Sequence, residues 1–263
     1  SDFENKTVPQ LVAETIEMYP EHVVYEYRDV KGRTRTINYR GYFESVKNFA
    51  AGLTLLGLNG KKMLIISDNC VELSVSIMAS MGSGGIDIEK ENAYPAGELK
   101  QIFNIINPDF VCLQNNESYD KYRSIGVSEK VPLIFFDPTG INLPAGARTF
   151  RDVCDSGGLH RRRRDDSFTK ALRSSKPEDP TTIVFTSGTT GTPKGVLLSH
   201  QNLSFACTEF AKNVYLVDSE IYLSFLHMRH IGEKLAIFMA LIHGYRIVLS
   251  SIPELREDMG KIR

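Results

Sequence analysis

The chain of 263 residues is 42% hydrophobic and 24% charged, an ordinary globular composition that excludes general disorder. Its 31 basic and 32 acidic residues give a net charge of −1, so no overall field attracts nucleic acid or an anionic membrane. The four cysteines lie far apart without a Cys-x-x-Cys spacing, which favours free thiols in a reducing compartment over a zinc site.

The first half of the chain is expected to alternate strands and helices. Runs of β-branched and aromatic residues predict strands at 23–27, 34–39, 62–67, 86–88, 110–113 and 131–136. Apolar residues at helical spacing predict helices at 8–19, 42–56, 71–81 and 95–106, the first capped by Thr7 and the third by Asn69. This alternation predicts the α/β class, with parallel sheets covered by helices.

Residues 138–180 differ in character from the segments on either side. They are rich in Pro and Gly and show little sustained apolar periodicity, which predicts a connecting segment. The run Arg161-Arg162-Arg163-Arg164 lies within it, and a contact to phosphate or nucleic acid is its functional interpretation. Because Asp165-Asp166 follows at once and no aromatic residue interleaves, we expect a solvated loop instead.

After this segment the pattern of strands and helices resumes. Strands are predicted at 181–186, 196–198, 221–226 and 247–249, and helices at 200–213, capped by Ser199, and at 232–243. The longest uncharged apolar run, 235–242, is too short to span a bilayer. We expect the fold to be incomplete at the last residue, Arg263.

The stretch 185–195, Phe-Thr-Ser-Gly-Thr-Thr-Gly-Thr-Pro-Lys-Gly, carries the clearest chemistry. It leaves a predicted buried strand, and its glycines let backbone N–H groups approach an anion without interference from a Cβ atom. Five Ser or Thr hydroxyls and the ammonium of Lys194 add donors, so the stretch predicts a polyphosphate cradle. It does not fit the pattern G-x-x-x-x-G-K-[ST]. On composition alone, a polar surface turn is the alternative.

The full order of these residues resembles, at every position, the phosphate-loop signature of the adenylate-forming enzymes, which include acyl-CoA synthetases, peptide-synthetase adenylation domains and luciferases. Residues 222–234 look like a pattern of long-chain acyl-CoA synthetases, whose His and acid fall on His230 and Glu233. Residues 50–88 are similar to the first subdomain of that family. The chain departs from the family at His227, at Gly232-Glu233-Lys234 and at Glu89-Lys90-Glu91.

The resemblance implies a two-step reaction in which a carboxylic acid, we expect a long-chain fatty acid, reacts with ATP and then with coenzyme A. A different carboxylic acid or a carrier-protein acceptor is the nearest alternative. Mg²⁺ would share the triphosphate charge. The residues expected to contact the β- and γ-phosphates are Thr186, Ser187, Gly188, Thr189, Thr190, Gly191 and Lys194. Lys194 and His230 are the candidate catalytic residues; a histidine packed at a strand-to-helix turn is the alternative for His230. His227 and His230 lack a third ligand nearby in sequence, so we assign no metal site.

The other working parts of the family, a Y-G-x-T-E segment, a ribose-binding aspartate and a C-terminal lysine, do not occur up to Arg263. We therefore expect the first part of a longer ligase, inactive alone, with an α/β subdomain at 1–137, a connecting segment at 138–180 and the phosphate-loop region at 181–263. A nucleotide-binding or scaffold module without catalysis is the alternative. We expect a cytoplasmic location and no nucleic-acid partner. Peripheral membrane contact and oligomeric state are left open.

Overall fold

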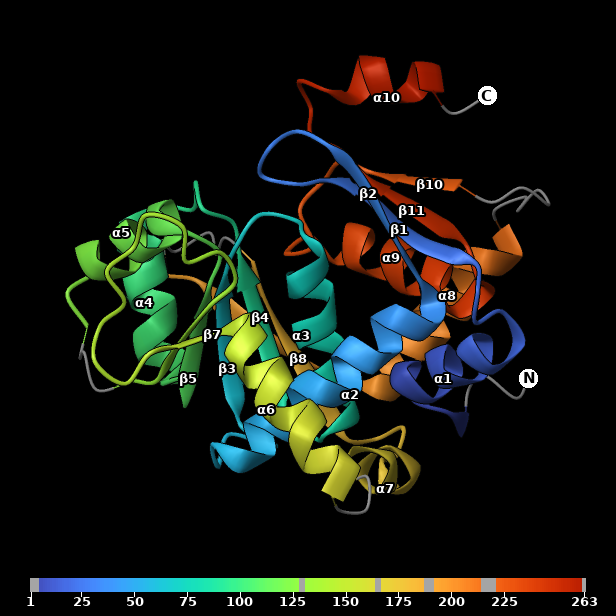
Figure 1. The fold of residues 1–263 in the computed structure, drawn as a ribbon, viewed down its shortest axis with the longest axis horizontal. Helices are drawn as coiled ribbons and strands as arrows, with labels where there is room; N and C mark the ends of the chain where they lie inside the picture. The colour runs from blue at the N-terminus through green and yellow to red at the C-terminus, as the bar shows by residue number, and fades with distance from the viewer. Residues whose placement is uncertain (1–4, 128–130, 164–166, 187–191, 214–220, 262–263) are drawn as a thin grey trace.

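The computed structural model of the chain describes residues 5–127, 131–163, 167–186, 192–213 and 221–261 (Figure 1). The described strands form two sheets, one of seven strands in the order β7-β6-β5-β3-β4-β8-β9 and one of four in the order β10-β11-β1-β2. Helices cover both sheets (Figure 1). The α/β class with parallel sheets under helices, expected from the sequence, is confirmed.

The seven-stranded sheet is parallel except at one edge. Its strands are β3 (Lys62–Ile66), β4 (Ile86–Lys90), β5 (Phe110–Leu113), β6 (Leu133–Phe135), β7 (Arg148–Thr149), β8 (Pro180–Thr186) and β9 (Lys194–Ser199). Strands β8 and β9 are antiparallel, as two strands joined by a hairpin must be. The parallel arrangement brings the carboxyl ends of β3, β4, β5 and β8 to the same edge of the sheet.

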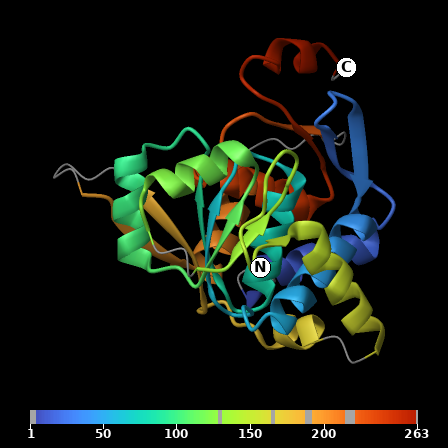
Figure 2. The same ribbon diagram turned by 60° about the vertical axis from the view of Figure 1, so that its left-hand side comes forward.

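Different helices cover the two faces of this sheet (Figure 2). Helices α4 (Ala96–Ile106) and α5 (Asn116–Ser124) pack on one face, where their apolar side chains meet Leu64, Ile88 and Val111. The other face is covered by helices α2 (Tyr39–Leu55), α3 (Val71–Gly82), α6 (Phe150–Arg163) and α7 (Ser167–Ser174).

The four-stranded sheet pairs strands from the first part of the chain with strands from its last part. It consists of β1 (Val23–Arg28), β2 (Thr34–Asn38), β10 (Ile221–Ser224) and β11 (Arg246–Leu249), and β1 pairs in parallel with β11. The helices beside it are α1 (Val8–Met18), α8 (His200–Asn213), α9 (Ile231–His243) and α10 (Leu255–Lys261). The Thr15 hydroxyl of α1 donates to the Ile242 carbonyl of α9 at 2.5 Å, so segments far apart in sequence close one core.

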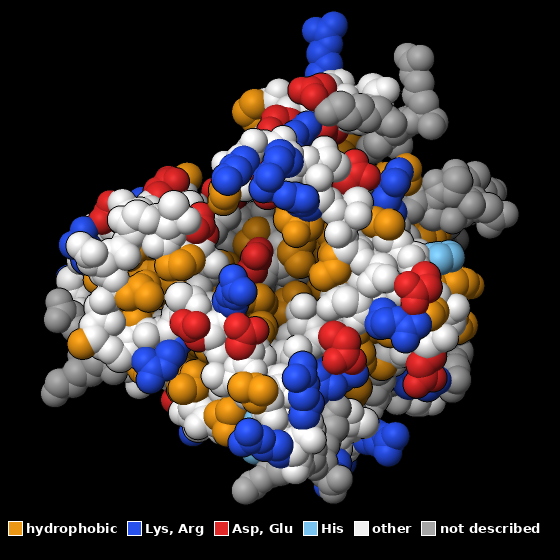
Figure 3. Space-filling view, in the orientation of Figure 1, with side chains coloured by type: hydrophobic (Ala, Val, Ile, Leu, Met, Phe, Trp, Pro, Cys, Tyr) orange, Lys and Arg blue, Asp and Glu red, His pale blue; other side chains and the backbone are white. Residues whose placement is uncertain are grey.

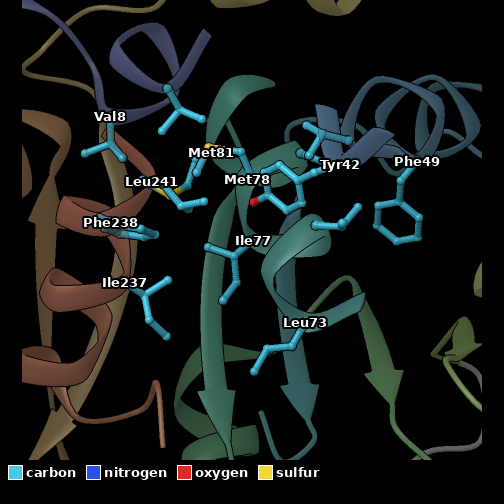
Figure 4. Close-up of a cluster of buried hydrophobic side chains, with 14 of the residues drawn as sticks. Val8, Tyr42, Phe49, Leu73, Ile77, Met78, Met81, Ile237, Phe238 and Leu241 are labelled. Atoms are coloured by element: carbon cyan, nitrogen blue, oxygen red, sulfur yellow. The ribbon is translucent and has the colours of Figure 1, made fainter. Parts of the chain in front are cut away.

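Helix α3 lies at the centre of that core (Figure 4). Its residues Leu73, Ile77 and Met78 are fully buried between α9 and α2. The buried Ser74 hydroxyl is satisfied, because it lies 2.6 Å from the Tyr25 hydroxyl and 2.9 Å from that of Tyr42. The buried Ser76 hydroxyl has no hydrogen-bond partner among the described residues. A helix that is apolar almost all round is therefore the element on which both sheets pack.

The cap of α3 differs from the expectation. Cys70, not Asn69, is the N-cap, and its sulfur accepts from the Leu73 backbone N–H at 3.4 Å. All four cysteines are free, as expected. Ser199 does cap α8, since its hydroxyl accepts from the Asn202 backbone N–H at 3.3 Å. Among the described residues, no helix combines the length and the apolar character needed to cross a membrane.

The segment 138–180 contains secondary structure that the sequence analysis did not predict. Helix α6 includes Arg161 to Arg163, so the loop expected there is wrong, although Arg162 and Arg163 are exposed to solvent as expected; Arg164 lies outside the described residues. The glycines that suggested a loop instead allow close helix packing, because a Cβ atom on Gly157 would lie 1.9 Å from the Asn48 carbonyl oxygen of α2. Arg161 donates to Asn48 at 2.6 Å and to Glu44 at 3.0 Å, which fastens the end of α6 to α2.

The close contact between α6 and α2 at Gly157 gives a prediction for stability, with the next residue, Gly158, as the control. Gly157→Ala should lower the free energy of unfolding by about 1–3 kcal/mol, because the new methyl group collides with backbone that cannot move independently. Gly158→Ala places its Cβ no closer than 3.3 Å, and only to the Asn48 side chain. That variant should be neutral or gain up to about 1 kcal/mol from helix propensity. Urea denaturation measures both; equal stabilities would contradict this packing.

Candidate functional site

The candidate site lies where the carboxyl ends of the parallel strands meet the start of α9. In open α/β sheets, ligands bind at this edge. The loop after β3 is held to the end of β4, since the Ser67 backbone N–H donates to the Lys90 carbonyl at 2.9 Å. Figure 3 shows a hollow between the parts built on the two sheets, with hydrophobic side chains at its floor and charged side chains at its rim.

The segment before α9 docks on the loop after β3. The Asn69 amide donates to the Leu226 carbonyl at 2.6 Å and accepts from the Met228 backbone N–H at 3.1 Å. The His227 ring accepts from the Arg229 backbone N–H through Nδ1, which leaves Nε2 to donate to the Ser67 carbonyl at 2.6 Å. Burial lowers the pKa of His227, in agreement with a neutral ring in this tautomer.

The predicted phosphate loop spans the turn between β8 and β9. Thr186 and Lys194 are cross-strand partners at its two ends, and both side chains are exposed. Ser187, Gly188, Thr189, Thr190 and Gly191 lie outside the described residues. Gly195 has a packing role that composition did not reveal, because a Cβ atom there would lie 3.0 Å from Ile183 and 3.1 Å from Phe185.

His230 is the N-cap of α9, but its side chain makes no capping hydrogen bond. Its ring is exposed, and its backbone N–H donates to the His227 carbonyl at 3.0 Å. Partial burial and the nearby Arg229 guanidinium lower the pKa of His230, so the ring is more often neutral at pH 7. Its catalytic role stays a prediction, as do those of Thr186 and Lys194.

Glu233, the acid of the long-chain synthetase pattern, is buried in the first turn of α9. It accepts from the Tyr222 hydroxyl at 2.8 Å and from the Ser224 hydroxyl at 2.7 Å, both on β10. Burial raises its pKa, and the two hydroxyl donors oppose that shift. These contacts fix α9 against the four-stranded sheet.

Next to Glu233, Lys234 forms a buried cluster that the sequence analysis did not identify. Its ammonium lies 2.5 Å from Asp87 Oδ2, 2.9 Å from Glu89 Oε1 and 2.7 Å from Thr182 Oγ1, so each of its three N–H groups has an acceptor. All four side chains are buried. The available signal was Asp87, a charged residue between two isoleucines of the strand predicted at 86–88, because a charge in a buried strand must be paired.

The protonation of this cluster follows from its two carboxyls and one ammonium. Burial raises the pKa of Asp87, and the neighbouring Glu89 adds to the shift. Burial also opposes ionisation of Glu89, but Lys234 outweighs it and lowers the Glu89 pKa. The Lys234 pKa is raised, because the two carboxyls outweigh burial. Of the two carboxyls, Asp87 is therefore the one that is more easily protonated, and Glu89 is the one that Lys234 keeps ionised.

Removing Lys234 should leave the carboxyls buried without a counter-ion. Lys234→Met is expected to lower the free energy of unfolding by about 3–5 kcal/mol, and adding Asp87→Asn and Glu89→Gln should recover part of that loss. Lys61→Met, at an exposed lysine before β3, should change it little. Urea denaturation at pH 7 is the measurement. A loss below about 1 kcal/mol for Lys234→Met would show that the ion pairs contribute little.

The chain thus has an α/β architecture, in which a mostly parallel seven-stranded sheet ends in the β8–β9 hairpin and a four-stranded sheet lies beside it. The family described as AMP-binding enzyme matches residues 12–262. The chain therefore belongs to the AMP-binding enzyme family, which confirms the resemblance found in the sequence.

Comparison with individual proteins agrees with this membership. The chain is 26% identical over 274 residues to the probable acyl-activating enzyme 16, chloroplastic, of Arabidopsis thaliana, matching 99% of this chain and 38% of that protein. It is 24% identical to a long-chain-fatty-acid–CoA ligase of Xenopus laevis, matching 87% of this chain and 31% of that protein. The chain thus spans well under half of the length of these relatives.

Solved structures share the fold. A putative long-chain-fatty-acid CoA ligase from Rhodopseudomonas palustris CGA009 superimposes with a TM-score of 0.75 at 18% identity, covering 93% of this chain and 57% of that one. VinN in complex with L-aspartate gives a TM-score of 0.75 at 15% identity, covering 98% of this chain and 60% of that one. At these identities the likeness concerns the architecture.

Proposed function

We propose that the chain is the phosphate-binding part of an ATP-dependent acid–thiol ligase, which converts a carboxylic acid to an acyl-adenylate and then to an acyl-CoA. The observation that carries the proposal is the β8–β9 hairpin, which sets Thr186 opposite Lys194 at the carboxyl end of β8, the edge at which open α/β sheets bind ligands. Membership of the AMP-binding enzyme family supports nucleotide binding at that edge.

The proposed role of the hairpin in the reaction is electrostatic. A carboxylate attacks the α-phosphate of ATP, and both reactants are anionic, so the protein must offset repulsion and stabilise charge on the departing pyrophosphate. Lys194 is exposed and makes no ion pair with any other residue that the structure describes, which leaves its ammonium available for a phosphate. The Thr186 hydroxyl supplies a neutral donor on the facing strand.

A long-chain fatty acid is the substrate we propose. Two relatives, from Xenopus laevis and Homo sapiens, carry the name long-chain-fatty-acid–CoA ligase and are 24% and 23% identical to this chain. Coenzyme A is the proposed acceptor, and Mg²⁺ is proposed to accompany the triphosphate and share its charge. The chain alone is expected not to turn over, because the adenine, ribose and C-terminal lysine segments of the family do not occur in it.

Lys194 provides the test. In a longer protein that contains this chain, Lys194→Ala should lower the rate of acyl-adenylate formation by roughly 10²-fold, the scale of losing one charge-stabilising donor. Carboxylate-dependent exchange of pyrophosphate into ATP measures that step. Lys61→Ala, an exposed lysine before β3 and therefore at the other end of the strands, should leave the rate unchanged. An unchanged rate in Lys194→Ala would remove this residue from the mechanism.

Substrate class is tested separately. A screen of that protein with ATP, coenzyme A and saturated acids of increasing length should give the highest kcat/KM with long-chain acids. Activity confined to short or aromatic acids would contradict the fatty-acid assignment while leaving adenylation intact. Failure of every acid to support exchange, with nucleotide still bound, would favour the non-catalytic binding module instead.

A further inference from the structure

Lys90, the last residue of β4, is a buried cation without a bonded acceptor. Only 2% of its surface is exposed. Its ammonium makes no hydrogen bond or ion pair with any residue in the described part of the chain. It lies 4.8 Å from the centroid of the Tyr94 ring and 5.4 Å from that of the Phe185 ring. An ammonium has three N–H groups to satisfy, and ring faces offset only part of the loss of water.

The carboxylates around Lys90 are each bound by another group. Glu89 accepts from Lys234 at 2.9 Å, Glu91 pairs with Arg229, and Glu98 accepts from the Tyr94 hydroxyl at 3.2 Å. Among the described residues, none of these carboxylates makes a hydrogen bond with Lys90, so its three N–H groups have no acceptor there.

The position of Lys90 relates it to the hairpin. Strand β4 pairs in parallel with β8 in a register that sets Asp87 beside Thr182. Carried along both strands, this register sets Lys90 beside Phe185, in agreement with the contact between their side chains. The next residue on β8 is Thr186, where the turn begins. The Lys90 ammonium thus lies at the foot of the predicted phosphate loop.

We propose that Lys90 is a further ligand-binding residue, whose ammonium contacts an oxyanion of the ligand held at the β8–β9 hairpin. The oxyanion is either a phosphate oxygen of the nucleotide or the carboxylate of the acid, and the chemistry that Lys90 recognises is the same for both. The inference rests on the proposed function, and it adds to Lys194 a second cation that comes from a different strand.

Proton linkage follows from the surroundings of Lys90. Burial lowers its pKa to about 8, Arg229 adds to that shift, and Glu89, Glu91 and Glu98 oppose it. A bound anion favours the charged form and raises this pKa. Binding should therefore take up a proton near pH 8–9, and affinity should fall as the pH rises above about 8, where the free protein loses the Lys90 charge.

The experiment is calorimetric titration of the chain with two separate probes, sodium tripolyphosphate and octanoate, at pH 7 and pH 9. For one of the probes, Lys90→Met should weaken binding at pH 7 by roughly tenfold or more, the scale of a lost charge-assisted hydrogen bond. Lys90→Arg should retain most of the affinity. Lys100→Met, at an exposed lysine of α4, is the matched control and should bind as the unmodified chain does.

The outcomes separate the proposals. Weakening in the tripolyphosphate arm identifies a phosphate contact, and weakening in the octanoate arm identifies a carboxylate contact. Equal affinity of Lys90→Met and the unmodified chain for both probes overturns the inference but leaves the hairpin proposal standing. An unmodified chain that binds neither probe overturns both. If Lys90→Met fails to fold, proton uptake by the unmodified chain, compared in buffers of different ionisation enthalpy, decides; no uptake at pH 8–9 overturns the inference.

Discussion

The buried Lys234 ammonium is the interaction on which the geometry of the candidate site depends. It binds Asp87 and Glu89 on β4 and Thr182 on β8, so a residue of α9 holds two adjacent strands of the seven-stranded sheet. Taking three ionisable groups out of water is unfavourable unless every donor and acceptor is engaged. Each N–H group of Lys234 has an acceptor, whereas Asp87 Oδ1 has no hydrogen-bond partner among the described residues. The three contacts of Lys234 fix α9 against the sheet.

Because α9 is fixed in this way, the segment before it and the strand β8 bound to it also have defined positions. The helix begins at Ile231 directly after His230, and the preceding His227 is held to the Ser67 carbonyl at the end of β3. Strand β8, bound through Thr182, runs straight into the hairpin that carries Lys194. Acyl activation of the proposed kind needs several hydrogen-bond donors held in position together. The strands and α9 beneath the hairpin hold its donors in place.

Much of the architecture could be predicted because the signals are local. Short apolar runs such as Met63 to Ile66 and the regular spacing of Tyr42, Val46 and Phe49 determine strands and a helix without reference to the rest of the chain. Helix α6 was missed because Gly157 there serves a close contact with α2, which is visible only once both helices are in place. Helix α5 was missed because only Ser118 and Tyr122 of it are buried.

The candidate site, too, could be predicted from the sequence only in part. Its hairpin was predicted from an unbroken order of residues at 185–195, since that chemistry is carried by consecutive positions. The cations of Lys90 and Lys234 were not, because the groups that surround them come from β4, β8 and the segment before α4, and only the folded chain brings these together. A charged residue in a strand predicted to be buried indicates a partner but does not identify it.

The central claim is that the hairpin between β8 and β9 binds the phosphates of a nucleotide. A crystal structure of this chain with ATP and Mg²⁺ tests it most directly. The account predicts phosphate density bounded by Thr186 and Lys194, with the strands beneath unmoved. Triphosphate density at another edge of the sheet, with the hairpin holding no ligand, would contradict it.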